Sequence, residues 1–327
     1  MYFQRDILEK KMNNAGTKNS PFLFGIDFEM NEGFFITDPL SQSDILFDVN
    51  GIGNSNEVTS HYTKKLSYYN LEIFPEELTV YKKRFKRVIK GIKRGDNYLT
   101  NLTIETPVKT TLSLKEIFNL SKSTYKLLVP DRFVCFSPEC FIKITDGKIY
   151  TFPMKGTIDA SIPDAEKIVI NDEKETTEHN TIVDLLRNDL SKVANNVRVN
   201  RFRYTDVVKT NKGSLIQVSS EIEGTLPSKY QSDIGTILFK LLPAGSVSGA
   251  PKESTLRTII EAEKKPRGYF TGVAGYFDGT NLDSFVLIRF IEQNEKGLVF
   301  HSGGGITSKS DVNKEYLESL QKVYLPF

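Results

Sequence analysis

Residues 269–301 read YFTGVAGYFDGTNLDSFVLIRFIEQNEKGLVFH and give the clearest indication of the fold. Apolar and β-branched residues alternate in it with two groups of turn residues, one at 278–281 and one at 294–297. Turn residues of this kind reverse the chain between neighbouring strands. The stretch therefore predicts an antiparallel meander, with strands at Tyr269–Phe277, Asp283–Glu292 and Leu298–His301.

Asp146-Gly147 predicts another hairpin, because it is flanked by Phe141–Ile144 and Lys148–Thr151. Between the strands, apolar residues recur at helical spacing. The expected helices are Pro75–Arg94, Glu173–Val193, Asp233–Leu242, Lys252–Lys264 and Val312–Val323. Antiparallel strands with helices between them predict an α+β fold rather than a parallel α/β fold.

Composition narrows the class of protein. The chain has 327 residues, 39% hydrophobic and 26% charged, which is ordinary for a globular protein and long enough for one large core. A net charge of +2 gives no reason to expect nucleic acid or a membrane as partner. With only Cys135 and Cys140, neither a zinc site nor a disulfide framework is expected. No apolar run could span a bilayer, so we expect a cytoplasmic protein.

Two pairs of glutamates are the first candidates for chemistry. Glu175 and Glu178 are three residues apart on one expected helix, and Glu315 and Glu318 are three apart on another. That spacing places both carboxylates of a pair on one helix face. If the two faces met, the carboxylates would suit Mg²⁺, which prefers oxygen ligands. The alternative is two solvated helix faces, since surface glutamate pairs are common.

Glu139 and Lys155 flank the hairpin at Asp146-Gly147 and could face each other at its mouth. A glutamate beside an apolar segment can act as a general acid, because burial raises its pKa. A partly desolvated lysine can act as an amine nucleophile. The alternative is a surface ion pair that contributes little.

Two segments of small residues raise the question of an anion site. Residues 243–252, PAGSVSGAPK, lead directly into a helix, where exposed backbone N–H groups favour an anion. Gly303-Gly304-Gly305 raises the same question, although a tight turn would also need small residues. Arg289, near the end of a meander strand, could reach a carboxylate through its planar guanidinium.

Taken together, the chain resembles the chorismate-utilising enzymes, a family that includes anthranilate, aminodeoxychorismate, isochorismate and salicylate synthases. The resemblance runs from about Tyr98 to Lys322. Six ordered motifs carry it: Ser137-Pro138-Glu139, Lys155-Gly156-Thr157, Glu178 with Ile182–Leu190, Pro243–Lys252, Arg267-Gly268-Tyr269 and Gly303–Glu318. It implies two antiparallel sheets packed face to face with helices outside. It also implies one catalytic, chorismate-binding domain over residues 1–327, with residues 1–70 as a shortened N-terminal portion.

The resemblance assigns roles to matching positions. Glu178 and Glu318 would be the main Mg²⁺ ligands, with Glu175 and Glu315 as companions. Substrate contacts would come from Arg289 and Tyr269 to the enolpyruvyl carboxylate, assisted by Gly156, Thr157, Gly303 and Gly304. Glu139 would protonate the departing C4 hydroxyl of chorismate.

Lys155 separates the members of the family, because aminodeoxychorismate synthases resemble this chain in having lysine before Gly-Thr. Adding the lysine amine at C2 first would direct ammonia to C4, giving 4-amino-4-deoxychorismate for 4-aminobenzoate and folate synthesis. No glutaminase-like cysteine is present, so a separate glutamine amidotransferase would supply the ammonia. Leu99 stands where isochorismate and salicylate synthases have a lysine base, and Gln217 stands where a histidine is usual. Anthranilate synthase component I and a non-catalytic chorismate-binding subunit remain alternatives.

Overall fold

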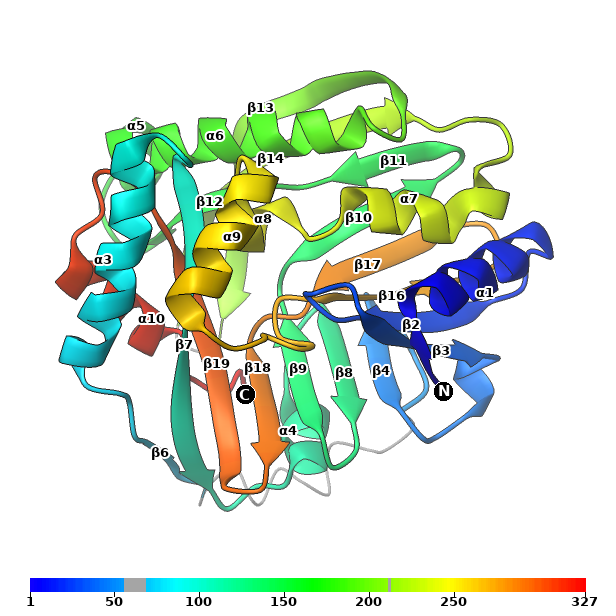
Figure 1. Cartoon of the computed structure of the whole chain (residues 1–327), viewed down its shortest axis with the longest axis horizontal. Helices are drawn as coiled ribbons and strands as arrows, with labels where there is room; N and C mark the ends of the chain where they lie inside the picture. The colour runs from blue at the N-terminus through cyan, green and yellow to red at the C-terminus, as the bar shows by residue number, and fades with distance from the viewer. Residues whose placement is uncertain (56–68, 211–212) are drawn as a thin grey trace.

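The computed structural model describes residues 1–55, 69–210 and 213–327 (Figure 1). Within them, two large antiparallel sheets face each other and helices cover the outside, which confirms the predicted α+β class. The N-terminal portion, residues 1–70, supplies strands to both sheets as far as it is described. No helix in the described ranges is long and apolar enough to cross a membrane.

The first sheet has ten strands. Their order is β1 (Tyr2–Gln4), β3 (Glu32–Thr37), β2 (Phe22–Ile26), β16 (Val273–Phe277), β17 (Leu282–Val286), β10 (Cys140–Thr145), β11 (Lys148–Thr151), β14 (Gly213–Thr225) and β12 (Met154–Asp159), with β13 (Asn195–Thr210) paired to β14. The predicted hairpin at Asp146-Gly147 joins β10 to β11, with Ile144 opposite Ile149.

The second sheet has nine strands. Their order is β15 (Gly249–Ala250), β7 (Leu99–Thr110), β19 (Gly297–Ile306), β18 (Phe290–Asn294), β9 (Phe133–Ser137), β8 (Tyr125–Val129), β4 (Leu46–Val49) and β5 (Ile52–Gly53), with β6 (Leu71–Ile73) paired to β7. The Gly303-Gly304-Gly305 segment lies within β19, opposite Thr103, Leu102 and Asn101 of β7, and is therefore strand rather than loop.

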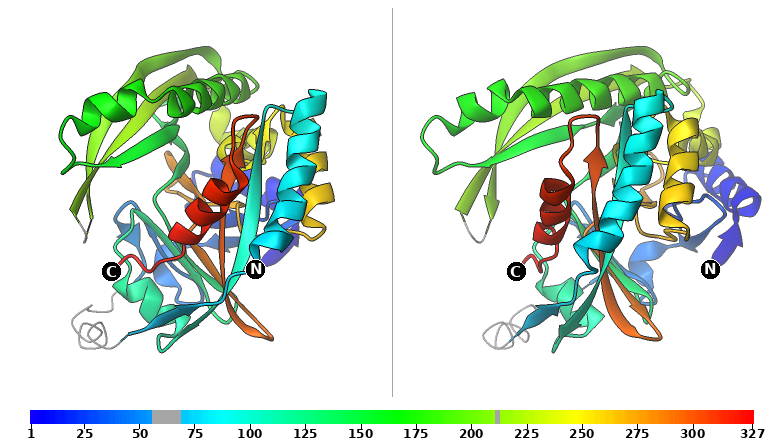
Figure 2. Two further views of the ribbon diagram at one scale, coloured as in Figure 1. Left: turned by 90° about the vertical axis from the view of Figure 1, so that its left-hand side faces the viewer. Right: turned by 60° about the vertical axis from the view of Figure 1, so that its left-hand side comes forward.

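The five predicted helices are present, with ends that differ by three residues at most. They are α3 (Leu78–Arg94), α6 (Glu173–Leu190), α7 (Ile234–Leu241), α9 (Lys252–Glu263) and α10 (Val312–Gln321). Among the residues that the structure describes, four further α-helices were not predicted, namely α1 (Arg5–Thr17), α4 (Leu114–Leu120), α5 (Ala165–Asn171) and α8 (Gly245–Ser248). Figure 2 shows α10 alongside β19 and α3, and α6 lying along β12–β14.

The predicted meander needs correction. β16 begins at Val273 rather than Tyr269, and β19 continues to Ile306. Asp283–Glu292 is also not a single strand. β17 ends at Val286 in the first sheet, and β18 begins at Phe290 in the second. Between them, Arg289 adopts a left-handed backbone conformation with φ 53°. Leu287, in this crossing, is fully buried between the sheets. The crossing is therefore made of apolar residues without turn residues, and in the sequence it resembles a continuous strand.

Apolar side chains fill the space between the two sheets. Phe34 and Phe285 of the first sheet belong to one buried cluster with Phe47, Phe133 and Phe290 of the second. A second cluster lies between the first sheet and helices α1, α6 and α7. The hydrophobic effect at these two layers fixes how the sheets and α6 lie relative to one another.

Candidate active site

Helix α6 carries one of the two glutamate pairs. It begins where the Asp172 side chain accepts a hydrogen bond from Glu175 N at 2.8 Å, an N-cap that satisfies one of the otherwise unpaired N–H groups. Ile182 and Leu186 follow Glu178 at steps of four residues and are buried. Glu178 therefore lies on the inward face, where its carboxylate is also buried. Glu175 is half-buried one turn earlier.

Helix α10 carries the second pair. Its N-cap is Asp311, whose side chain accepts hydrogen bonds from the backbone of Asn313 and Lys314 at 3.0 Å. Glu315 is 2% exposed, so it is a core-facing residue rather than part of a solvated face. Glu318 is half exposed and accepts a hydrogen bond from Lys322 Nζ at 2.9 Å.

Lys155 reaches the site from a β-bulge in β12. Met154 pairs with Ser219 and Thr157 with Gln217, so Lys155 and Gly156 form the irregular step between them. Gly156 has φ 84°, a conformation in which a side chain is strained. Bulges commonly redirect a side chain next to a site. Here the bulge places Lys155 Nζ 3.4 Å from Glu178 Oε2.

Glu139 lies in the turn between β9 and β10, where its N–H donates to Ser137 Oγ at 3.1 Å. Its carboxylate accepts a short hydrogen bond from the Ser246 hydroxyl. Burial raises the pKa of Glu139, although Ser246 and the positive charges of Lys155, Arg289 and Lys322 act in the opposite direction. A carboxyl group with a raised pKa is suited to donate a proton near neutral pH.

Two glycines of β19 bring these groups together. A Cβ at Gly304 would lie 3.5 Å from Glu315 Oε2 and 3.8 Å from Glu318 Oε1. A Cβ at Gly305 would lie 3.7 Å from Lys155 Nζ, which pairs with Glu178. The predicted residues from β12, α6 and α10 thus gather along one glycine-rich stretch of strand.

The carboxylates of the two glutamate pairs are oxygen ligands of the kind that Mg²⁺ prefers. They lie on two different helices, Glu175 and Glu178 on α6 and Glu315 and Glu318 on α10. Among the residues that the structure describes, no three His, Cys, Asp or Glu side chains are grouped closely enough to hold a metal ion. Lys155 pairs with Glu178, and Lys322 pairs with Glu318. Mg²⁺ usually binds through one or two carboxylates and keeps waters or substrate oxygens. Two carboxylates, one from each pair, are therefore enough in number and chemical type for Mg²⁺.

Lys322 and Ser246 belong to this group of residues and were not predicted. Lys322 Nζ donates to Gly303 O at 2.8 Å as well as to Glu318. Burial lowers the pKa of Lys322, Glu318 raises it, and Arg289 and Lys155 lower it further. Lys322 lies four residues after Glu318 and seven after Glu315, a helical spacing that could have pointed to it.

Arg289 lies at this group, whereas Tyr269 does not. The Arg289 guanidinium acts on the pKa of both Glu139 and Lys322, and it lies 5.5 Å from the ring centre of Tyr324. Tyr269 instead lines a separate cavity with Arg132. Thr157 is exposed on β12, beyond the bulge. The two residues predicted to share the enolpyruvyl carboxylate are therefore not brought together.

Comparison with known proteins identifies the family. The model of the chorismate binding enzyme family matches residues 38–326. The chain belongs to that family. Leu99 and Gln217, the two positions at which the sequence analysis expected a different residue, lie close to these groups. Leu99 Cδ1 would lie 3.0 Å from a Cβ at Gly305, and Gln217 Nε2 donates to Met154 Sδ at 2.7 Å.

Several relatives within the family are similar over much of the chain. An uncharacterized PabA-like protein of Pasteurella multocida is 48% identical over 320 residues, covering 97% of both chains. Aminodeoxychorismate synthase component 1 of Bacillus subtilis is 30% identical over 260 residues, which is 73% of this chain and 54% of that protein. Anthranilate synthase component 1 of Aquifex aeolicus is 34% identical over 199 residues, 57% of this chain and 38% of that one.

A solved structure shares the fold. The menaquinone-specific isochorismate synthase MenF of Escherichia coli aligns with a TM-score of 0.73 at 15% identity, covering 98% of this chain and 82% of that one. At this identity the likeness concerns the arrangement of the sheets and helices alone.

Proposed function

We propose that this chorismate-binding enzyme is an aminodeoxychorismate synthase component I. It would convert chorismate and ammonia to 4-amino-4-deoxychorismate and water. The observation that carries the proposal is the position of Lys155, whose amine lies 3.4 Å from the buried Glu178 carboxylate and close enough to Glu139 to lower its pKa. An amine nucleophile and a carboxylic acid are then available at one place.

In the proposed reaction, the ammonium group of Lys155 first gives a proton to water, and the resulting neutral amine forms a bond from Nζ to C2 of chorismate; the proton is regained when Lys155 is released. The two ring double bonds shift along the ring, and the C4–O bond breaks. Glu139 donates its proton to the departing hydroxyl, which leaves as water. Ammonia then forms a bond to C4, the double bonds shift back, and the C2–N bond breaks to release Lys155. A proton lost from the incoming nitrogen restores Glu139.

Other residues would bind and orient the substrate. Arg289 and Lys322 provide positive charge for carboxylates, and the glycines of β19 leave room beside them. Glu178 and Glu318, with Glu175 and Glu315 as companions, would hold Mg²⁺. When bound, Mg²⁺ supplies positive charge for the ring carboxylate of chorismate. Ammonia would come from a separate glutamine amidotransferase, and the product would serve 4-aminobenzoate and folate synthesis in the cytoplasm.

The test is a product assay with purified protein, chorismate, Mg²⁺ and ammonium, analysed by chromatography with and without an aminodeoxychorismate lyase. We expect 4-aminobenzoate only when the lyase is added. In Lys155→Ala, its formation should fall on the order of 10²-fold or more, since the nucleophile is lost. Lys143→Ala is the matched control, because Lys143 forms an ion pair with Asp283 on the first sheet. It should retain activity.

The main rival is anthranilate synthase component I. Fluorescent anthranilate formed without a lyase, and unchanged in Lys155→Ala, would sink the proposal. Chorismate binding with no product at any ammonium concentration would instead favour a non-catalytic subunit, the rival to which Leu99 and Gln217 point.

A further inference from the structure

Tyr324 lies beside Arg289 at the group of residues around Lys155, and it belongs to none of the six motifs that carry the family resemblance. The Arg289 guanidinium lies 5.5 Å from the centre of the Tyr324 ring. Arg289 Nε also donates a hydrogen bond to the Tyr324 hydroxyl at 3.4 Å. Because aromatic faces attract cations, the ring helps to hold the guanidinium in position.

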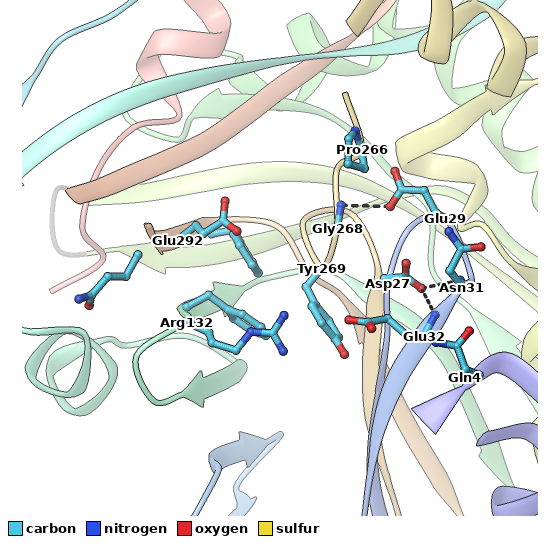
Figure 3. Close-up of a pocket in the computed structure, with 13 residues that line it drawn as sticks. Gln4, Asp27, Glu29, Asn31, Glu32, Arg132, Pro266, Gly268, Tyr269 and Glu292 are labelled. Atoms are coloured by element: carbon cyan, nitrogen blue, oxygen red, sulfur yellow. Dashed lines mark hydrogen bonds between the residues drawn. The ribbon is translucent and has the colours of Figure 1, made fainter. Parts of the chain in front are cut away.

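Tyr269, which was predicted to bind the enolpyruvyl carboxylate together with Arg289, lies elsewhere. Figure 3 shows it in the separate cavity, near Arg132 and Glu292. Its ring stacks on Phe133, with the ring centres 5.3 Å apart. The tyrosine hydroxyl that lies at Arg289 is therefore that of Tyr324.

Packing of the segment after α10 sets the position of Tyr324. Alternate residues of this segment are buried in one apolar cluster, namely Val323, Leu325 and Phe327. Such alternation is that of an extended chain, whose successive side chains point to opposite sides. Lys122 N donates to Pro326 O at 2.8 Å and holds the segment against the protein. Burial of the alternate side chains therefore directs Tyr324 away from the core.

Both Arg289 and Tyr324 can form further hydrogen bonds. Arginine has five N–H donors, and the bond from Nε to Tyr324 is the one hydrogen bond that the Arg289 side chain makes among the described residues. The Tyr324 hydroxyl accepts that bond and donates none within the same part of the chain. Tyr324 is 41% exposed, so a ligand can reach it. A carboxylate accepts several hydrogen bonds at once, and arginine donates to it in pairs.

We propose that Tyr324 and Arg289 together bind the enolpyruvyl carboxylate of chorismate, so that Tyr324 has the role that was predicted for Tyr269. This rests on the proposed function, in which Arg289 provides positive charge for a substrate carboxylate. The Tyr324 hydroxyl donates to the carboxylate, and its ring orients the guanidinium for the same contact. Lys322, two residues earlier, already reaches this group, where its Nζ donates to Gly303 O at 2.8 Å.

Tyr324→Phe is the direct test, because it removes the hydroxyl, keeps the ring beside Arg289 and should fold normally. We expect the dissociation constant of chorismate, measured by calorimetry with Mg²⁺ and without ammonium, to rise roughly tenfold, as for losing a hydrogen bond to a charged group. In the product assay KM should rise to a similar degree while kcat changes less than about twofold, since the contact binds substrate and transition state alike. Tyr324→Met also removes the ring. It should weaken binding further, and it gives a second test if Tyr324→Phe folds poorly.

Tyr2→Phe is the matched control. Tyr2 is 40% exposed, and the Arg132 guanidinium lies 4.9 Å from the centre of its ring. Because Arg132 lines the separate cavity, Tyr2→Phe should bind chorismate like the unchanged protein. Unchanged chorismate affinity in Tyr324→Phe, or an equal loss in Tyr2→Phe, would overturn the role of Tyr324.

The outcomes also separate this role from the proposed function. If anthranilate is the product and Tyr324→Phe still weakens chorismate binding, only the Lys155 chemistry is wrong. If 4-aminobenzoate forms with added lyase, and KM is the same in Tyr324→Phe as in the unchanged protein, only the role of Tyr324 is wrong. No binding of chorismate by the unchanged protein would overturn both.

Discussion

At the scale of single residues, Asp27 links stability to pH. Its side chain is 6% exposed, and its pKa is raised from 3.8 to about 6 by burial, with Glu29 and Glu32 contributing. Between about pH 4 and pH 6, the folded protein holds a proton that the unfolded chain releases. The free energy of unfolding therefore falls as the pH rises through this window, and the loss is complete above the folded pKa.

Asp27→Asn should remove that pH dependence. The asparagine oxygen can still accept the two backbone hydrogen bonds, and no charge is buried. At pH 8 we expect the free energy of unfolding to increase by up to ~3 kcal/mol, the equivalent of about two pKa units. Urea unfolding between pH 4 and pH 8 measures this. Asp131→Asn, at an exposed turn position with φ 59°, is the control and should keep the original slope. An unchanged slope in Asp27→Asn would contradict the account.

At the scale of secondary-structure elements, the N-cap of α10 connects helix stability to the site. Asp311 holds the first turn of the helix that carries Glu315 and Glu318. Asp311→Ala should lower the free energy of unfolding by about 1 kcal/mol. Because the first turn also positions the carboxylates that are proposed to hold Mg²⁺, the proposed function predicts that this variant needs more Mg²⁺ for half-maximal activity. Titration of activity with Mg²⁺ measures that effect.

A cap elsewhere provides the matched control. Ser113 forms a capping box with Glu116 at the start of α4, away from the two glutamate pairs. Ser113→Ala should cost a similar amount of stability, yet leave the Mg²⁺ dependence unchanged. Equal shifts in both variants would mean that the Mg²⁺ effect reflects general destabilisation and not the position of α10.

At the scale of the whole molecule, a buried ion pair joins three separate parts of the chain. Arg267 pairs with Glu263 of α9, and both side chains are almost fully buried. Its guanidinium also donates to Val247 O in α8 and to Asn101 O in β7, each at 2.9 Å. Burial raises the pKa of Glu263, but the charge of Arg267 and the hydrogen bonds from Arg267 and Thr103 lower it by more. The pKa is therefore below its usual value, and the carboxylate remains charged.

Arg267→Met should therefore lower the free energy of unfolding by about 3–5 kcal/mol, because Glu263 is left charged and buried without its partner. The double variant Glu263→Gln with Arg267→Met should recover part of that loss. Arg257→Met, in an exposed pair with Glu253, should change stability by less than about 0.5 kcal/mol. Thermal or urea unfolding compares the three. A loss in Arg267→Met no larger than in Arg257→Met would contradict the role of the pair.

Local pattern predicted much of the fold. The helical periodicity around Ile182 and the turn at Asp146-Gly147 mark elements that the structure contains. The crossing between β17 and β18 was missed, because its residues are apolar and a buried crossing resembles a continuous strand. The short helices α4, α5 and α8 were missed since each has fewer than eight residues, too few to show a periodicity.

The family, the α+β class and the candidate residues at positions 139, 155, 178 and 318 could be predicted from the amino-acid sequence. Those follow from local spacing and ordered motifs, which need no knowledge of distant contacts. Only the tertiary structure decided which residues meet. It brought Lys155 to Glu178 through a bulge, added Lys322 and Ser246, and separated Tyr269 from Arg289. The physical reason is that contacts between remote segments depend on how two sheets pack and on where the chain crosses between them, and neither is written in the spacing of neighbouring residues.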